Sequence, residues 1–294
     1  MRCVSLMVTV LVLAAGAACR RQAPPEPPLA KVSLSLNRSQ LPLGSPVELT
    51  YRFEVGPNPP AVSENYRVFA GVVDANQELM WTDDHDPPTP TTQWKSGQTI
   101  EYTRTIFIPI YPYIGDATIH MGLYSTKSQK RVTLVGEDAG HLAYRVAKIQ
   151  LLPQSANIFF VRKDGWHGPE SPPNDARVEW QWTKKTEATV AFKNPKADAV
   201  FYLDLDNPSA TFPQGQHIQV KLGDAVMDDF TLEPAHELLR KVPLLAAQLG
   251  SGEMVELKIL ADKTFVPALV PGSANRDSRE LGVRVFHAFV GLKN

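Results

Sequence analysis

The sequence predicts an all-β protein with two tandem β-sandwiches, the first immunoglobulin- or fibronectin-III-like and the second jelly-roll-like. Apolar and polar side chains alternate from residue 47 to residue 55, which is typical of a strand with one buried face. The chain has 25 prolines, and clusters of Pro, Gly, Asn and Asp separate such segments as turn residues do. We find no convincing pattern of an amphipathic helix.

The first 18 residues are typical of a signal peptide. Arg2 supplies a short positive region, and residues 4–18 are uncharged but too few for a comfortable membrane span, which needs about 20 residues. Small residues then precede Cys19. The segment resembles the bacterial lipobox, in which the cysteine is acylated and becomes the mature N-terminus, although Gly16 stands where Leu is usual. An ordinary secretory signal cut just before this cysteine is the alternative.

The mature chain is predicted to lack disulfides, because Cys3 leaves with the signal and Cys19 carries the lipid. An exported protein without disulfides needs a sizeable core, and about 275 residues allow two domains. Residues 19–30 are rich in proline and predict an extended tether of roughly 30 Å. The lipid would hold the protein at the cell envelope. Since Arg20 rather than Asp follows the cysteine, resemblance to lipoprotein sorting implies the outer membrane of a Gram-negative cell.

Each half of the mature chain has the strand spacing of a sandwich. Residues 31–153 predict an immunoglobulin-like domain, and Pro153 with the polar stretch behind it marks the boundary. Residues 157–294 predict a jelly-roll-like domain, with one helical turn at 244–249 that follows Pro243 and ends at Gly250. Strands are expected at 47–55, 66–73, 99–108, 116–125 and 143–152. In the second domain they are expected at 158–163, 177–183, 186–193, 199–205, 217–222, 226–232, 254–261 and 281–291, the last a central strand because it is apolar on both faces.

Short motifs resemble accessory β-sandwich domains associated with bacterial envelope glycosyltransferases. In the second domain they are GWHGPE at 165–170, RVEW at 177–180 and RELGVR at 279–284. In the first domain, PTTQWKSG at 90–97 and GLY at 122–124 resemble a pattern of sandwich domains that follow membrane mannosyltransferases. The chain lacks the catalytic region of those enzymes. The resemblance therefore implies binding or scaffolding in envelope glycosylation.

A long turn in the second domain gathers aromatic and acidic side chains. The candidate ligand-binding residues are Trp166, His167, Glu170 and Asp175. Sugar rings present apolar C–H faces that stack on indole, while their hydroxyls bond to carboxylates. The alternative is a core role for the tryptophans, which the shared strand face of Trp180 and Trp182 favours for that pair.

The densest acidic cluster lies in the first domain. Its candidate metal ligands are Asp83, Asp84 and Asp86. Carboxylates this close together could supply oxygen ligands to Ca²⁺, although their spacing differs from that of a dedicated calcium loop. The alternative is a solvated loop between strands. No other cofactor is predicted.

The motifs give no support for catalysis. The chain has no Gly-x-Ser-x-Gly elbow, no His-Glu-x-x-His and no phosphate-binding glycine loop. After loss of Arg2, 29 basic residues face 31 acidic ones, and no basic run indicates nucleic-acid binding. We therefore predict a non-enzymatic envelope lipoprotein that binds polysaccharide or the glycosylation machinery. The alternatives are a protein–protein module that pairs through edge strands, and a hydrolase whose carboxylates are distant in the chain.

Overall fold

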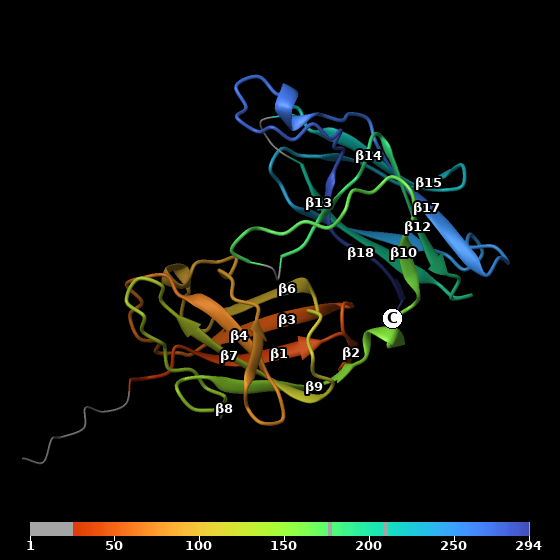
Figure 1. The fold of residues 1–294 in the computed structure, drawn as a ribbon. Helices are drawn as coiled ribbons and strands as arrows, with labels where there is room; N and C mark the ends of the chain where they lie inside the picture. Colours follow the sequence, from red (N-terminus) through yellow and green to blue (C-terminus); the bar gives the residue numbers. More distant parts are fainter. Residues whose placement is uncertain (1–25, 176–177, 208–210, 294) are drawn as a thin grey trace, which may run out of the picture.

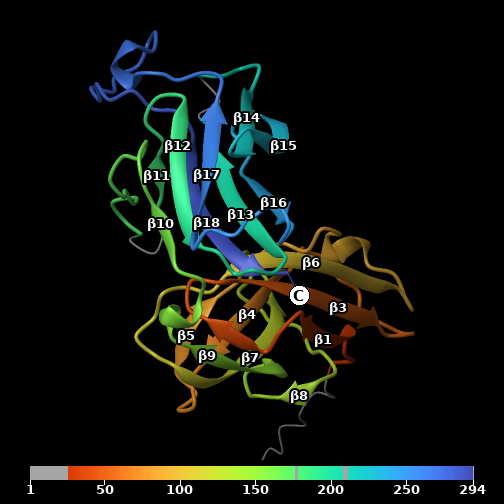
Figure 2. The ribbon, with the colours of Figure 1, turned by 90° about the vertical axis from the view of Figure 1, so that its right-hand side faces the viewer.

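The structure is a computed structural model that describes residues 26–175, 178–207 and 211–293. The predicted signal peptide and Cys19 lie outside these residues. No helix in the described part of the chain is long and apolar enough to cross a membrane. Its regular structure is β-strand apart from three short 3-10 turns, which confirms the all-β prediction. Figures 1 and 2 show two β-rich units, one above the other.

The first unit is a sandwich of two sheets. Its strands are β1 (Ala30–Leu36), β2 (Gln40–Pro42), β3 (Pro46–Val55), β4 (Arg67–Val73), β5 (Leu79–Thr82), β6 (Thr99–Phe107), β7 (Gly115–Tyr124), β8 (Glu137–Asp138) and β9 (Tyr144–Leu152). One sheet has the order β1-β3-β6 and the other β2-β9-β7-β4-β5, with β8 beside β9. β2 runs parallel to β9, whereas the other strand pairs of this unit are antiparallel. Immunoglobulin-type sandwiches have this architecture, so the predicted type is confirmed.

β3 shows how the sequence pattern becomes a buried face. It is the central strand of its sheet, and the polar residues between its apolar ones remain at least partly exposed. Its five apolar residues are 0–5 % exposed, and they are Val47, Leu49, Tyr51, Phe53 and Val55. Full burial of such a side chain contributes about 1.5–3 kcal/mol relative to exposure. Leu29, just before β1, is also buried, so the chain enters this core at the end of the predicted tether.

The second unit is also a sandwich of two sheets. Its strands are β10 (Phe160–Arg162), β11 (Gln181–Trp182), β12 (Glu187–Lys193), β13 (Ala199–Asp206), β14 (Gln216–Leu222), β15 (Ala225–Leu232), β16 (Leu238–Leu244), β17 (Met254–Ala261) and β18 (Arg284–Leu292). The sheet orders are β10-β12-β17-β14-β15 and β11-β18-β13-β16. From β11 onward the chain crosses between the sheets at every connection except β14 to β15. Apart from β10, each sheet has four strands, and two four-stranded sheets connected in this way form a jelly roll, which confirms the prediction.

β18 is an interior strand, as its two-sided apolar sequence predicts. It lies between β11 and β13, and Val285 and Val290 point into the core between the sheets. Arg284 points to the opposite, outer face, where it lies beside Asp206 of β13. The outer face of this sheet therefore carries charged side chains next to aromatic ones.

One region of the second unit differs from the sequence prediction. β16 has no counterpart among the predicted strands, and it contains Pro243, which we expected ahead of a helical turn. β16 is an edge strand, where a residue without an N–H is tolerated. The expected helical turn is present as a single hydrogen-bonded turn: the Leu249 N–H donates to the carbonyl of Leu245, four residues earlier, at 3.3 Å. Gly250, with φ of +65°, ends this turn as expected.

The two units contact each other beside the connecting turn η2 (Gln154–Ala156). Phe107 at the end of β6 stacks on His287 of β18, with ring centroids 4.0 Å apart and 2° between the ring planes. Lys241 of β16 forms an ion pair with Glu48 of β3. These contacts join β16 and β18 to the first unit, and Figure 2 shows one end of β18 beside β6.

Candidate functional site

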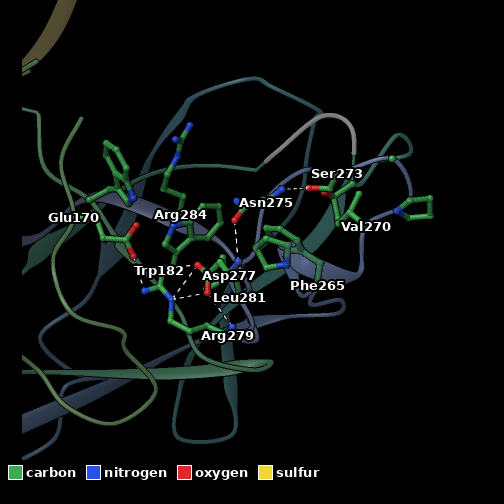
Figure 3. Close-up of a pocket in the computed structure, with 15 residues that line it drawn as sticks. Glu170, Trp182, Phe265, Val270, Ser273, Asn275, Asp277, Arg279, Leu281 and Arg284 are labelled. Carbon is green, nitrogen blue, oxygen red and sulfur yellow. Dashed lines mark hydrogen bonds and ion pairs between the residues drawn. The ribbon is translucent and has the colours of Figure 1, made fainter. Parts of the chain in front are cut away.

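The candidate site is a pocket of about 530 Å³ in the second unit. It lies between β11, the start of β18 and the loop from residue 262 to residue 283 (Figure 3). We call it the aromatic pocket. Its lining includes Glu170, Trp180, Trp182, Phe265, Ser273, Asn275, Asp277, Arg279 and Arg284.

Aromatic rings form one wall of this pocket. Trp182 pairs with Arg284 across β11 and β18, and Trp180 lies two residues earlier on the same face. The Arg284 guanidinium carbon is 5.2 Å from the Trp180 ring centre and 5.8 Å from that of Trp182. Phe265 of the loop packs edge to face on Trp182, with centroids 5.7 Å apart. The two tryptophans thus share one face, as predicted, but it is the outer face of the sheet, and Trp180 remains partly exposed.

An ion-paired cluster lines the pocket next to these rings, because Glu170 pairs with Trp180 through the backbone. Arg279 donates to Glu170 Oε1 through Nη1 at 2.7 Å, and to the Asp277 carboxylate through Nη2 at 2.6 Å and Nε at 3.0 Å. These hydrogen bonds from Arg279 lower the pKa of Asp277, and bonds to both carboxylates raise the pKa of Arg279. The cluster joins two segments that are 109 residues apart.

The loop holds this cluster through three successive turns. The Asn275 N–H donates to Ser273 Oγ at 3.1 Å, and the Asp277 N–H donates to Asn275 Oδ1 at 2.9 Å. The Arg279 N–H donates in turn to Asp277 Oδ1 at 2.9 Å. Short polar side chains that bond to the backbone two residues on are typical of such turns. They fix the direction in which Asp277 and Arg279 point.

The charges lining the aromatic pocket are compensated. Arg284 forms a two-pronged ion pair with Asp206 of β13. Arg279 is paired with Glu170 and Asp277. Both arginines among the described lining residues therefore have carboxylate partners, and the pocket offers no unpaired cation to an anionic ligand.

Several polar atoms of this pocket retain hydrogen-bonding capacity. Trp180 Nε1 is buried and has no hydrogen-bond partner among the described residues. The second oxygen of Glu170 likewise makes no hydrogen bond to them, and Ser273 and Asn275 are exposed. Apolar ring faces beside such donors and acceptors suit an uncharged ligand with many hydroxyls. The arrangement can stack a sugar ring and bond its hydroxyl groups.

Of the four predicted ligand-binding residues, the structure brings only Glu170 into this pocket. The expectation for Trp166 needs correction: it is 8 % exposed, belongs to the core, and its Nε1 donates to the Thr189 carbonyl at 2.8 Å. Gly165 before it has φ of +86°, and a Cβ there would lie 2.3 Å from the Glu187 carbonyl oxygen. The Gly-Trp motif therefore encodes a close backbone approach that buries the indole.

The other two predicted residues lie outside the lining. His167 Nε2 lies 2.9 Å from the Glu280 carbonyl oxygen, so its ring ties the turn to the end of the charged loop. Asp175 belongs to a partly exposed turn, in which its N–H donates to the Pro172 carbonyl at 3.3 Å. Neither side chain faces the aromatic pocket.

The three aspartates predicted for calcium do not converge. Residues 83–86 follow β5 in extended form and continue its pairing with β4, so successive side chains point to opposite faces. Asp83 points inward and bonds to Arg104, Asp84 accepts from Tyr124 at 3.2 Å, and Asp86 pairs outside with an arginine of β4. Within the described residues, no group of three or more His, Cys, Asp or Glu side chains could hold a metal ion.

Sequence reasoning missed most of this pocket. The charged turn at 275–280 is visible in the sequence, but its simplest interpretation is a structural salt bridge. Nothing local indicates that Arg279 reaches Glu170, or that Phe265 packs on Trp182, because both contacts depend on how the long loop folds over the sheet.

No protein-family model and no curated protein matches the chain. Among solved structures, it is similar to the Pseudomonas fluorescens alkylpurine DNA glycosylase AlkC bound to DNA containing an abasic site analog, with 13 % identity and a TM-score of 0.27 over 42 % of this chain and 30 % of that one. It is also similar to Bacteroides uniformis β-glucuronidase, with 8 % identity and a TM-score of 0.29 over 90 % of this chain and 30 % of that one.

A third similar structure is the N-terminal CBM22-1–CBM22-2 tandem domain of Paenibacillus barcinonensis Xyn10C, with 8 % identity and a TM-score of 0.25 over 90 % of this chain and 91 % of that one. The chain thus spans 30 % of the length of the first two proteins. TM-scores this low give no indication of function. The relationship to glycosyltransferase-associated domains stays a prediction, since none of these three proteins is a glycosyltransferase.

Proposed function

We propose that this chain is a lipid-anchored protein of the bacterial cell envelope that binds polysaccharide without cleaving it, through a neutral sugar unit held in the aromatic pocket. The observation that supports this is that Trp180 and Phe265 line the same pocket as the Glu170–Arg279–Asp277 cluster. The rings supply an apolar surface for the C–H face of a sugar, and the cluster supplies acceptors for its hydroxyls.

The same geometry favours binding over hydrolysis. Glycoside hydrolysis needs two carboxyl groups, one of which is protonated near neutral pH to act as the general acid. In the aromatic pocket, Glu170 and Asp277 are both paired with Arg279, and the hydrogen bonds from Arg279 lower the pKa of Asp277. A carboxylate held in this way is a poor proton donor and a good hydroxyl acceptor.

A glycan array probed with the full chain and with Trp180→Ala tests the proposal. The wild type should bind neutral polysaccharides, and Trp180→Ala should lower that affinity at least about tenfold, because it removes the stacking surface. Leu269→Ala is the matched control, since Leu269 is 78 % exposed in the same loop but does not line the pocket. Equal binding by wild type and Trp180→Ala, or silence across the array, refutes the carbohydrate role. Recovery of a specific envelope protein instead would support an interaction module.

The membrane anchor is tested separately. Intact-mass measurement of the protein from the membrane fraction should show a mature chain that begins at Cys19 and carries a diacylglycerol adduct. A mature chain without the adduct, found in the soluble fraction, would show that the signal is an ordinary secretory one. Fractionation of a Gram-negative host would place the lipoprotein in the outer membrane if Arg20 acts as the sorting residue.

A further inference from the structure

A second pocket lies where the two units meet, and its chemistry differs from that of the aromatic pocket. It has a volume of about 740 Å³ and is lined by β10, the connecting turn η2, β11 and β18. Gly44 from the first unit closes it on one side. We call it the junction pocket.

Arg162 is the charged group of the junction pocket. It is half-buried, and its guanidinium lies over the Trp166 ring at 5.2 Å. Its Nε is buried without a partner, and its terminal nitrogens make no hydrogen bond or ion pair with any described residue. Glu179 interacts with Arg162 electrostatically, but the two side chains are too far apart to form an ion pair. Burial lowers the pKa of Arg162, which shows how little compensation the guanidinium receives.

An unpaired arginine in a pocket is unusual, because buried cations are normally paired and hydrogen-bonded. Every other pocket-lining arginine of the second unit in the described residues has a carboxylate partner, as Arg279 and Arg284 show. The planar guanidinium fork of Arg162 matches the two oxygens of a carboxylate. An anion that enters the pocket would supply the partner that Arg162 lacks among the described residues.

The rest of the lining indicates which kind of anion fits. Gln181 Oε1 is also buried without a partner, and as an acceptor it requires a donor such as a hydroxyl. Phe160 and Phe289 contribute apolar surface, and Phe159 at the rim is 61 % exposed. A ligand that meets all three requirements carries a carboxylate, hydroxyl groups and an apolar ring face.

We propose that the junction pocket binds the carboxylate-bearing unit of an acidic polysaccharide, a hexuronate, through an ion pair to Arg162, a hydroxyl bond to Gln181 and contact with the phenylalanine rings. This site is independent of the aromatic pocket, since the two have no lining residue in common. It gives the protein a preference for acidic chains that the charge-compensated aromatic pocket does not supply.

Titration calorimetry of the full chain with tetragalacturonate and with its fully methyl-esterified form tests the proposal. The two probes share the same rings and differ in the charge. The acid form should bind about tenfold more tightly, because a charge-assisted pair to Arg162 is lost in the ester. Arg162→Gln should abolish that difference, and Arg162→Lys should keep part of it. Lys163→Gln is the matched control, since Lys163 is the next cation along the chain and pairs with Glu256 outside the pocket.

Trp180→Ala should leave the preference for the acid form unchanged, so failure of the aromatic-pocket role and failure of this one are distinguishable.

Labelling with phenylglyoxal, read by mass spectrometry, needs no variant: tetragalacturonate should protect Arg162, whereas its ester and inorganic phosphate at the same concentration should not. Equal affinity for both probes, a preference that survives Arg162→Gln, or protection by phosphate alone would overturn the proposal.

Discussion

Asp83→Asn should destabilise the first sandwich by about 2 kcal/mol, whereas Asp86→Asn, three residues away, should change its stability by less than about 0.5 kcal/mol. Asp83 is an inward residue whose side chain is 13 % exposed, and Asp86 is an outward one at 78 %. The same chemical change is thus made in two environments on one short segment.

The magnitude follows from the bonds that Asp83 accepts. Tyr51 Oη donates to it at 2.8 Å, and Arg104 donates at 2.8 and 3.0 Å. Hydrogen bonds to a charged group contribute about 1.5–3 kcal/mol each, but asparagine keeps one acceptor oxygen, and Arg104 is 39 % exposed, so water screens its share. Asp86 makes one exposed pair with Arg67, which is of little value in water.

Hydrogen–deuterium exchange of the β6 amides measures this difference, because β6 carries Arg104 and the method reports opening of the first unit without assuming two-state unfolding of the whole chain. Added Ca²⁺ should not slow this exchange in either variant or in the wild type.

Burial alone raises the pKa of Asp83, but the Arg104 bonds outweigh it and lower that pKa. The stabilisation is therefore full above the unfolded carboxyl pKa of about 4 and is lost as pH falls through the folded value. Equal effects of the two substitutions would refute the reasoning.

Two further predictions concern a histidine and a glycine. Burial lowers the pKa of His85, so the unfolded chain takes up a proton at a higher pH than the folded chain does. The free energy of unfolding should therefore fall below about pH 6.5, by up to about 1.4 kcal/mol per pH unit. In thermal melts, His85→Gln should flatten this pH dependence, whereas substitution of an exposed histidine, His236→Gln, should not. Gly282→Ala places a Cβ 2.3 Å from Thr183 Oγ1 and should lower the free energy of unfolding by about 1–3 kcal/mol, measured with denaturant. The control is Gly168→Ala, whose Cβ meets nothing within 4 Å, and it should leave that free energy almost unchanged. An unchanged midpoint for Gly282→Ala would contradict the close approach.

The sequence predicts strands well where burial is local and periodic. β3 and β17 follow the predicted bounds closely, because alternation alone specifies which face is buried. β16 carries Pro243, which locally disfavours a strand, and it forms because β13 offers a partner along an edge. β11 is two residues long, so its limits depend on the pairing of Trp182 with Arg284 rather than on any pattern.

The candidate site was less accessible to sequence reasoning. Glu170 and the charged loop are visible as polar clusters, but the ion pair that joins them links residues 109 positions apart. Trp166 and Trp180 look alike in sequence, yet Trp166 belongs to the core and bonds to the Thr189 carbonyl, whereas Trp180 lines the pocket. Exposure of a tryptophan depends on which segments fold over it, and no local pattern records that.

The most direct test of the central claim is the affinity of the full chain for neutral polysaccharide, compared between wild type, Trp180→Ala and Leu269→Ala by titration calorimetry. The account predicts measurable binding by the wild type and Leu269→Ala, with a loss of at least about tenfold in Trp180→Ala. Binding that is equally strong in all three proteins, or absent from all three, would contradict it.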